Sequence, residues 1–323
     1  LKKWVSHIRE YYLTKEFIIT KDKYGDWCVP PESLEMIHSN DPARKTDGAL
    51  IATAYYLKVL QLMHRFASIQ GLTADAKEWE DLEHKMKDAF NARFLHAKEG
   101  TSLVPGHTLY PDSIFYGNNT VTANILPLAF GLVPKPYIKE VAKNAVTTII
   151  TTNKGHISTG VIGTQWLMRE LSRRGHTDVA YLLATNDTYP SWGCWIANGA
   201  TTLLENWDLN ATRDISDNHM MFGEIGGWFY KGLGGIFPDP QQPGFKHIIL
   251  RPNFPSDLKQ FEARHHSPYG EIISKWERKK KSVVYVVTIP ANSSATLYLP
   301  DHVKGERMIE LEAGQHQFEW KLF

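Results

Sequence analysis

The chain has 323 residues, 42% hydrophobic and 22% charged, a composition typical of a globular protein of roughly two domains. Its 36 Lys and Arg against 35 Asp and Glu leave a formal charge of +1, so no net positive field is present to hold nucleic acid or an anionic membrane surface. No apolar run approaches the ~20 residues that span a bilayer, and two cysteines are too few for a disulfide framework or a thiolate-rich zinc site. We therefore expect no nucleic-acid partner, no membrane segment and no metal.

As far as about residue 235 the sequence has the period of amphipathic helices. Between Trp79 and Phe94 the apolar residues are three or four positions apart, and charged residues occupy the other face. Pro136 precedes a second such segment, residues 137–150, at a position suited to a first helical turn. The same pattern covers residues 2–17, 48–70, 119–132, 161–174, 176–186, 197–206 and 219–233. Roughly nine helices, with no strand and no fixed-period repeat among them, favour a closed (α/α) toroid over an open solenoid.

The helical period of the sequence ends at residues 234–244, where three prolines and three glycines exclude a helix. Beyond this point apolar residues alternate, most clearly at Val283, Tyr285, Val287 and Ile289. Short strands are predicted at residues 245–252, 271–276, 283–289, 295–299 and 307–311. We therefore predict two domains, a helical one over residues 1–235 and a small antiparallel β-domain over residues 236–323.

Aromatic and acidic residues gather between residues 186 and 228. This stretch holds four of the ten tryptophans together with Glu205, which ends the predicted helix 197–206. Flat ring faces cover the C–H face of a pyranose, while carboxylates bind its hydroxyls or move protons. The pattern is typical of sugar-processing sites. The alternative is that the tryptophans belong to the core and Glu205 is a surface acid.

A second acidic and aromatic cluster is Tyr24-Gly-Asp-Trp27, which places Asp26 beside an indole. It is either a sugar contact or an ordinary turn. The sequence has no glycine-rich dinucleotide or phosphate loop, no Gly-x-Ser-x-Gly elbow and no His-Glu-x-x-His motif, so no cofactor is expected.

Several segments, taken in order, resemble the α-L-rhamnosidases of glycoside hydrolase family 78. They are Tyr24-Gly-Asp-Trp27, Leu50-Ile-Ala-Thr-Ala-Tyr55, Ser158-Thr-Gly-Val-Ile-Gly-Thr164, Pro190-Ser-Trp192, Gly199-Ala-Thr-Thr-Leu-Leu-Glu-Asn-Trp-Asp208, Asn218-His219 and Pro243-Gly-Phe245. The resemblance runs from about residue 20 to the end of the chain. It implies an (α/α)6 barrel followed by a small β-sandwich, and hydrolysis of terminal α-L-rhamnose from rhamnosides or rhamnose-containing polysaccharides with inversion at the anomeric carbon.

The resemblance also implies roles for particular residues. An inverting glycosidase needs two carboxyl groups roughly 6.5–9.5 Å apart, a general acid and a general base. The Thr-Thr-x-x-Glu-x-Trp-Asp motif assigns the base to Glu205, and Glu224 competes for it in a stretch where Gly227 replaces an acid of many relatives. The residues implied to line the sugar subsite are Asp26, Trp27, Trp192, Trp207 and His219.

The general acid is not found in the sequence. In the family it belongs to an Asp- and Glu-rich motif ahead of the Gly-Asp-Trp loop, and nothing in residues 1–25 resembles that motif. Six helix pairs also make twelve helices, more than the roughly nine predicted here. We therefore expect an N-terminally incomplete barrel, whose missing part lies in the full protein or in a second chain, and no turnover by this chain alone.

Two other functions remain open at this level. One is an (α/α)6 glycosidase for another sugar, because subsite residues rather than the barrel set specificity. The other is a carbohydrate-binding protein of the same fold that is catalytically incomplete. An external rhamnoside favours a bacterial periplasmic or secreted location and leaves a cytoplasmic one open.

Overall fold

The structure is a computed structural model that describes residues 1–323 except 33–35, 37, 98–112 and 214. The chain forms two compact units. The first contains Leu1–Leu167 and Asn186–Phe222, and the second contains Met168–Thr185 and Gly223–Phe323. The predicted domain division after residue 235 stays a prediction, since these units divide the chain differently and group residues 168–185 with the strands.

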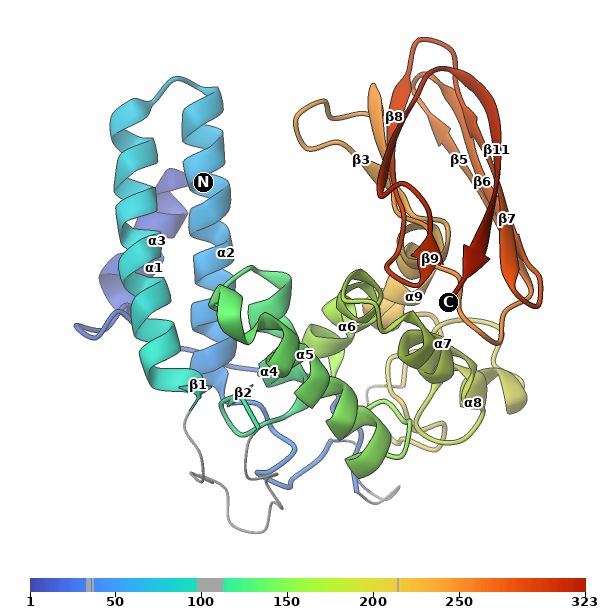
Figure 1. The fold of residues 1–323 in the computed structure, drawn as a ribbon. Helices are drawn as coiled ribbons and strands as arrows, with labels where there is room; N and C mark the ends of the chain where they lie inside the picture. The colour runs from blue at the N-terminus through green and yellow to red at the C-terminus, as the bar shows by residue number, and fades with distance from the viewer. Residues whose placement is uncertain (33–35, 37, 98–112, 214) are drawn as a thin grey trace. The chain divides into compact units, whose positions relative to one another are not determined.

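The first unit is built mainly from helices. They are α1 (Lys2–Tyr12), α2 (Gly48–Ile69), α3 (Thr73–Phe94), α4 (Val121–Ala129), α5 (Ile138–Thr147), the first part of α6 (Val161–Arg173) and α8 (Trp192–Ala197). Helix α2 begins where the Asp47 carboxylate accepts a hydrogen bond from the N–H of Ala49 (2.8 Å). Helices α2 and α3 lie side by side, and Leu57, Leu60 and Phe90 are fully buried (Figure 1). The predicted amphipathic pattern is confirmed in both helices.

Two short strands also occur in this unit, where the sequence predicts none. They are β1 (Leu95–His96) and β2 (Phe115–Tyr116), which pair antiparallel. Two residues are too few to produce a recognisable alternation in the sequence. Within the described residues, no helix combines the length and the apolar character needed to cross a membrane.

The helix predicted at residues 197–206 is wrong, and the helix of this region is α8, five residues earlier in the chain. It begins where the Ser191 hydroxyl accepts a hydrogen bond from the N–H of Cys194 (2.9 Å). It ends at Ala197, two residues before Gly199, whose φ of +88° is accompanied by a hydrogen bond from the N–H of Ala200 to the carbonyl of Trp195 (2.9 Å). This is a Schellman end, and it releases the following residues from the helix.

The second unit contains the end of α6, α7 (Thr177–Thr185), α9 (Glu224–Trp228) and the π-helical turn η4 (Phe229–Leu233), followed by strands. The single helix predicted at residues 219–233 is thus divided into short turns. Four glycines within these residues, at positions 223, 226, 227 and 232, explain why no long helix forms, because glycine lowers helix stability.

The strands form two sheets, ordered β10-β8-β4-β3 and β5-β6-β7-β11-β9. Their bounds are β3 (Ile236–Pro238), β4 (His247–Leu250), β5 (Gln260–Ser267), β6 (Gly270–Arg278), β7 (Ser282–Ile289), β8 (Ser294–Tyr298), β9 (Val303–Lys304), β10 (Met308–Leu311) and β11 (Gly314–Leu322). The five predicted strands are present. All pairs are antiparallel as predicted except β4 with β8, which run parallel.

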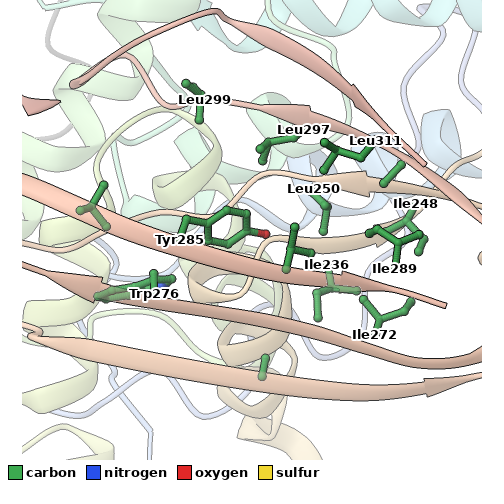
Figure 2. Close-up of a cluster of buried hydrophobic side chains, with 14 of the residues drawn as sticks. Ile236, Ile248, Leu250, Ile272, Trp276, Tyr285, Ile289, Leu297, Leu299 and Leu311 are labelled. Atoms are coloured by element: carbon green, nitrogen blue, oxygen red, sulfur yellow. The ribbon is translucent and has the colours of Figure 1, made fainter. Parts of the chain in front are cut away.

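Strands β5 and β11 were not predicted, because charged and polar residues on their outer faces hide the alternation. A hydrophobic core lies between the two sheets (Figure 2). In Figure 2, Leu250 and Leu297 of the four-stranded sheet lie opposite Tyr285 and Trp276 of the five-stranded sheet. These four side chains are fully buried, so this part of the chain is a sandwich with its own core.

Candidate active site

Asp26 joins three segments at one end of the helices of the first unit. Its Oδ2 accepts hydrogen bonds from the Thr122 hydroxyl (2.6 Å) and the N–H of Gly160 (2.9 Å). Its Oδ1 accepts from the N–H groups of Ile162 (2.8 Å) and Gly163 (3.0 Å), in the first turn of α6. A carboxylate at a helix N-terminus satisfies free amides there. Burial raises the pKa of the Asp26 carboxyl, and these four hydrogen bonds oppose that rise.

Glycines allow the loops around Asp26 to approach one another closely. A Cβ atom at Gly160 would lie 2.1 Å from the carbonyl oxygen of Trp27, which also accepts the N–H of Val161 (2.8 Å). The Trp27 ring is only partly buried and contacts Tyr24 at 5.5 Å and His38 at 4.7 Å between ring centroids. Trp27 therefore offers a partly exposed indole, whereas both oxygens of Asp26 are occupied within the protein.

Trp192 and Trp207 lie in a buried aromatic cluster. Trp207 is fully buried and stacks on Trp195 at 4.8 Å, with Phe222 at 4.3 Å and Trp192 at 5.2 Å. The indole N–H groups donate to backbone carbonyls, that of Trp192 to Phe222 (3.1 Å) and that of Trp207 to Thr159 (3.3 Å). This geometry matches the alternative in which the tryptophans belong to the core. Their role in the sugar subsite stays a prediction that no exposed ring face supports.

Glu205 lies on the irregular segment that contains Trp207, two residues before it. Its N–H donates to the carbonyl of Ser216 (3.0 Å), and the N–H of Ser216 donates to Glu205 Oε2 (3.2 Å). The Oε1 atom of Glu205 is 3.9 Å from Nε2 of the His219 ring. The backbone N–H of His219 donates to the carbonyl of Leu203 (2.9 Å). The N–H of Met221 donates to Nδ1 of His219 (3.1 Å), so in the neutral ring the proton is on Nε2, facing Glu205. The structure thus brings together two of the residues predicted for the site.

The sequence predicts no role for two residues of the motif that contains Glu205. Asn206 and Asp208 are buried. The side chain of Asn206 accepts a hydrogen bond from the backbone N–H of Asp208 (3.0 Å), and the side chain of Asp208 accepts one from the backbone N–H of Asn210 (2.9 Å). The Asn-x-Asp spacing is the signal that could have indicated these turns. Burial raises the pKa of the Tyr189 hydroxyl, and the Asp208 charge raises it further. These turns hold the backbone immediately after Glu205.

The competing carboxylate, Glu224, belongs to the second unit. Its Oε1 is 2.5 Å from Nε of Arg169, an ion pair in which both side chains are largely buried. Burial raises the pKa of Glu224, and Arg169 and Lys231 oppose that rise. The carboxylate is therefore engaged with a guanidinium. Within the described ranges, no three His, Cys, Asp or Glu side chains are grouped as a metal site would require.

The family model of the bacterial α-L-rhamnosidase six-hairpin glycosidase domain matches residues 1–233 of this chain, and that of the bacterial α-L-rhamnosidase C-terminal domain matches residues 235–314. The chain belongs to the bacterial α-L-rhamnosidase family. A curated α-L-rhamnosidase of Alteromonas sp. (strain LOR) is 31% identical over 337 residues, which cover 99% of this chain and 34% of that protein. The chain thus spans about a third of the length of the curated relatives it matches.

Two solved structures of this family are similar to the whole chain. The Streptomyces avermitilis α-L-rhamnosidase complexed with L-rhamnose is 27% identical with a TM-score of 0.80, and covers 98% of this chain and 30% of its own. The α-L-rhamnosidase from Dictyoglumus thermophilum is 29% identical with a TM-score of 0.84, and covers 99% of this chain and 36% of its own. The predicted resemblance and fold class, six-hairpin barrel helices followed by a β-domain, are confirmed.

Proposed function

We propose that this chain carries the general base of an inverting α-L-rhamnosidase, which releases terminal α-L-rhamnose from rhamnosides or rhamnose-containing polysaccharides. The observation that carries the proposal is the setting of Glu205, a carboxylate with 20% of its side chain exposed, one oxygen bonded to a backbone N–H and the other facing His219. Family membership and the complex of the Streptomyces relative with L-rhamnose support the choice of sugar.

In this reaction Glu205 takes a proton from a water molecule on the face of the sugar opposite the leaving group. The water oxygen bonds to the anomeric carbon while the glycosidic C–O bond breaks, and the general acid protonates the leaving oxygen. The partial exposure of Glu205 admits the water, and the Ser216 N–H holds the carboxylate in one orientation. His219 Nε2–H and the partly exposed Trp27 ring are the groups we assign to contact with the sugar.

We further propose that the general acid comes from outside these 323 residues, from another segment of the full protein or from a second chain. Two observations support this. The mechanism needs a second carboxyl group, and the family's acid motif has no counterpart ahead of Tyr24-Gly-Asp-Trp27. The relatives are also about three times as long as the chain. This chain alone is therefore expected not to turn over an aryl α-L-rhamnoside.

The test is Glu205→Gln in the full-length protein, with Glu224→Gln as the matched variant. Glu205→Gln is expected to lower kcat on an aryl α-L-rhamnoside by about 10³-fold and to leave L-rhamnose binding by calorimetry nearly unchanged. Glu224→Gln is expected to retain turnover in the folded fraction. Near-normal turnover by Glu205→Gln, or loss of turnover confined to Glu224→Gln, would exclude Glu205 as the base.

Proton NMR of the first product tests the stereochemistry. Inversion releases the β-anomer of L-rhamnose before mutarotation mixes the anomers, and release of the α-anomer would contradict the mechanism. A panel of other aryl glycosides tests the sugar. A higher kcat/KM on a different glycoside would replace rhamnose, and tight L-rhamnose binding without hydrolysis by the full-length protein would indicate a binding protein.

A further inference from the structure

Strand β5 (Gln260–Ser267) is the outermost strand of the five-stranded sheet, and among the described residues it pairs with β6 alone. The pairing runs without a break from Gln260 with Glu277 to Ser267 with Gly270. Every residue of the second unit, to which β5 belongs, is described. None of the residues assigned to the rhamnose site lies on this strand. The second unit therefore ends in a long, regular sheet edge, the kind of surface to which another strand can add.

Alternate residues of β5 direct their backbone N–H and C=O groups to the open edge. The N–H of Arg278 donates to the carbonyl of Lys259 (2.7 Å), so these two residues form a hydrogen-bonded pair just before the strand. Such pairs recur at every second position of an antiparallel ladder, and the odd-numbered residues of β5 therefore bond to β6. The residues whose backbone groups face the open edge are Gln260, Glu262, Arg264 and His266.

The side chains at the centre of this edge have opposite charges. Glu262 and Arg264 are exposed and form an ion pair with each other (2.6 Å). On the neighbouring strand, Nζ of Lys275 is 3.5 Å from Oε2 of Glu262. Oε2 of Glu271 is 3.4 Å from Nη1 of Arg264. Two positive and two negative groups thus balance here, so this edge does not repel a second edge of the same composition.

Open apolar space adjoins the same edge. A pocket of about 460 Å³ is lined by Phe229 and Tyr230 of η4 and by residues 261–264 of β5. The side chains of Phe229 and Tyr230 are both exposed, although they are large and apolar or aromatic. A strand added to β5 would cover part of this surface, and the burial of apolar area would add to the backbone hydrogen bonds.

We propose that β5 pairs antiparallel with β5 of a second copy of the protein, about a two-fold axis at Ala263, and so joins the two five-stranded sheets into one. In this register Glu262 lies opposite Arg264 of the second copy, and Arg264 lies opposite Glu262 of the second copy. Because the same surface serves both copies, both pairs form at once. The backbone groups that bond across the junction are the free ones of the even-numbered residues.

The charges select this register among the antiparallel alternatives. A shift by one residue would set the free backbone groups of one copy against residues of the other that already bond to β6. A shift by two residues in either direction would set Glu262 against Glu262, or Arg264 against Arg264. Like charges directly opposite each other destabilise a strand pair, whereas opposite charges stabilise it. The register centred on Ala263 also overlaps β5 over almost its whole length.

The test is sedimentation velocity of the full-length protein over a range of concentrations, where the wild type is expected to change from monomer to dimer as the concentration rises. Glu262→Lys brings two positive groups together across the junction, and Arg264→Glu brings two negative groups together. Each variant alone is expected to weaken dimerisation about tenfold. Glu312→Lys, the same change of charge at an exposed residue ahead of β11, is expected to dimerise like the wild type.

A mixture of the two variants tests the contact directly. The positive edge of Glu262→Lys matches the negative edge of Arg264→Glu, so an equimolar mixture is expected to form a one-to-one heterodimer. The double variant Glu262→Lys/Arg264→Glu has its charges exchanged and is expected to dimerise again by itself. In the wild type, the N–H groups of residues 262 and 264 should exchange with solvent severalfold more slowly at concentrations that favour the dimer.

Three results would overturn the inference. They are a wild type that stays monomeric at every concentration, single variants that associate like the wild type, and a mixture of the variants that does not associate. Circular dichroism checks the fold of each variant, and the exchange measurement needs no substitution. Hydrolysis of an aryl α-L-rhamnoside by the variants is expected to match that of the wild type, so the inference can fail without any effect on the role proposed for Glu205.

Discussion

The core of the β-sandwich and the segment that carries Glu205 are both rich in aromatics, but they are held in different ways. Strand β7 buries every second residue, from Val283 to Ile289, and pairs in regular register with β6 and β11. Residues 199–219 contain no helix or strand among the described positions. The Trp207 indole N–H donates to the carbonyl of Thr159, the Trp195 indole N–H donates to the carbonyl of Trp207, and Glu205 and Ser216 exchange hydrogen bonds within the segment. The sandwich is stabilised by many equivalent strand pairings and alternating buried side chains, whereas the Glu205 segment depends on a few individual contacts.

The largest expected effect comes from removing one buried indole in each region. Trp207→Ala and Trp276→Ala should each lower the free energy of unfolding by about 3–5 kcal/mol, because both side chains are fully buried. In the folded fraction of the full-length protein, only Trp207→Ala should lower rhamnoside hydrolysis, since Trp207 lies two residues after Glu205 in the same irregular segment. Urea denaturation and activity per folded molecule measure both effects. Equal loss of activity in the two variants would contradict the expected difference between the Glu205 segment and the core of the β-sandwich.

Substitutions of Asp26 test how much a single side chain contributes to the stability of the first unit. Asp26→Ala removes the acceptor of four hydrogen bonds and should lower the free energy of unfolding by about 3 kcal/mol. Asp26→Asn is the matched variant, which keeps the size and part of the acceptor capacity, and should cost about half as much. Hydrogen exchange at residues 160, 162 and 163 should accelerate in both. Unchanged exchange would mean that α6 begins without the help of Asp26.

Two glycines provide a smaller and closely matched comparison. Gly199 (φ +88°) precedes Glu205 and Gly244 (φ +86°) lies in the β unit, and a Cβ atom added at either glycine would have no atom within 4 Å. Alanine at either should cost about 1–2 kcal/mol through backbone strain alone. Thermal unfolding should show similar losses. Steady-state kinetics of the full-length protein should show a severalfold lower kcat/KM for Gly199→Ala only, and an equal change in kcat/KM for both variants would rule out a special role for the end of α8.

The smallest effect concerns pH. Burial lowers the pKa of His302 in the β unit below its ordinary 6.5, so the unfolded chain binds this proton more readily than the folded one. The free energy of unfolding should therefore fall as the pH drops below about 6.5. His302→Gln should reduce the loss between pH 7 and pH 5, measured by urea denaturation. His266→Gln, at an exposed histidine, is the control. If the free energy of unfolding depends on pH in the same way in both variants, His302 is not the group responsible.

The elements that could be predicted from the sequence are those with a repeating pattern. Helix α2 and strand β7 follow directly from the spacing of their apolar residues. Glu205 and His219 could be proposed from motifs, but their contact depends on how an irregular segment folds back on itself. The partners of Asp26 lie 96 to 137 positions further along the chain, and no local pattern specifies contacts over that separation. Helix α8 was missed because its signals, Ser191 and Gly199, are only caps.

The parallel pairing of β4 with β8 has a consequence for the order of folding. His247 pairs with Ser294, so the middle of the four-stranded sheet forms only after 47 further residues have been synthesised and closed into a loop. Until then β4 has an unpaired edge next to the short hairpin with β3. Such an edge invites pairing with another chain, so truncations within residues 290–298 should yield aggregates rather than a smaller folded unit.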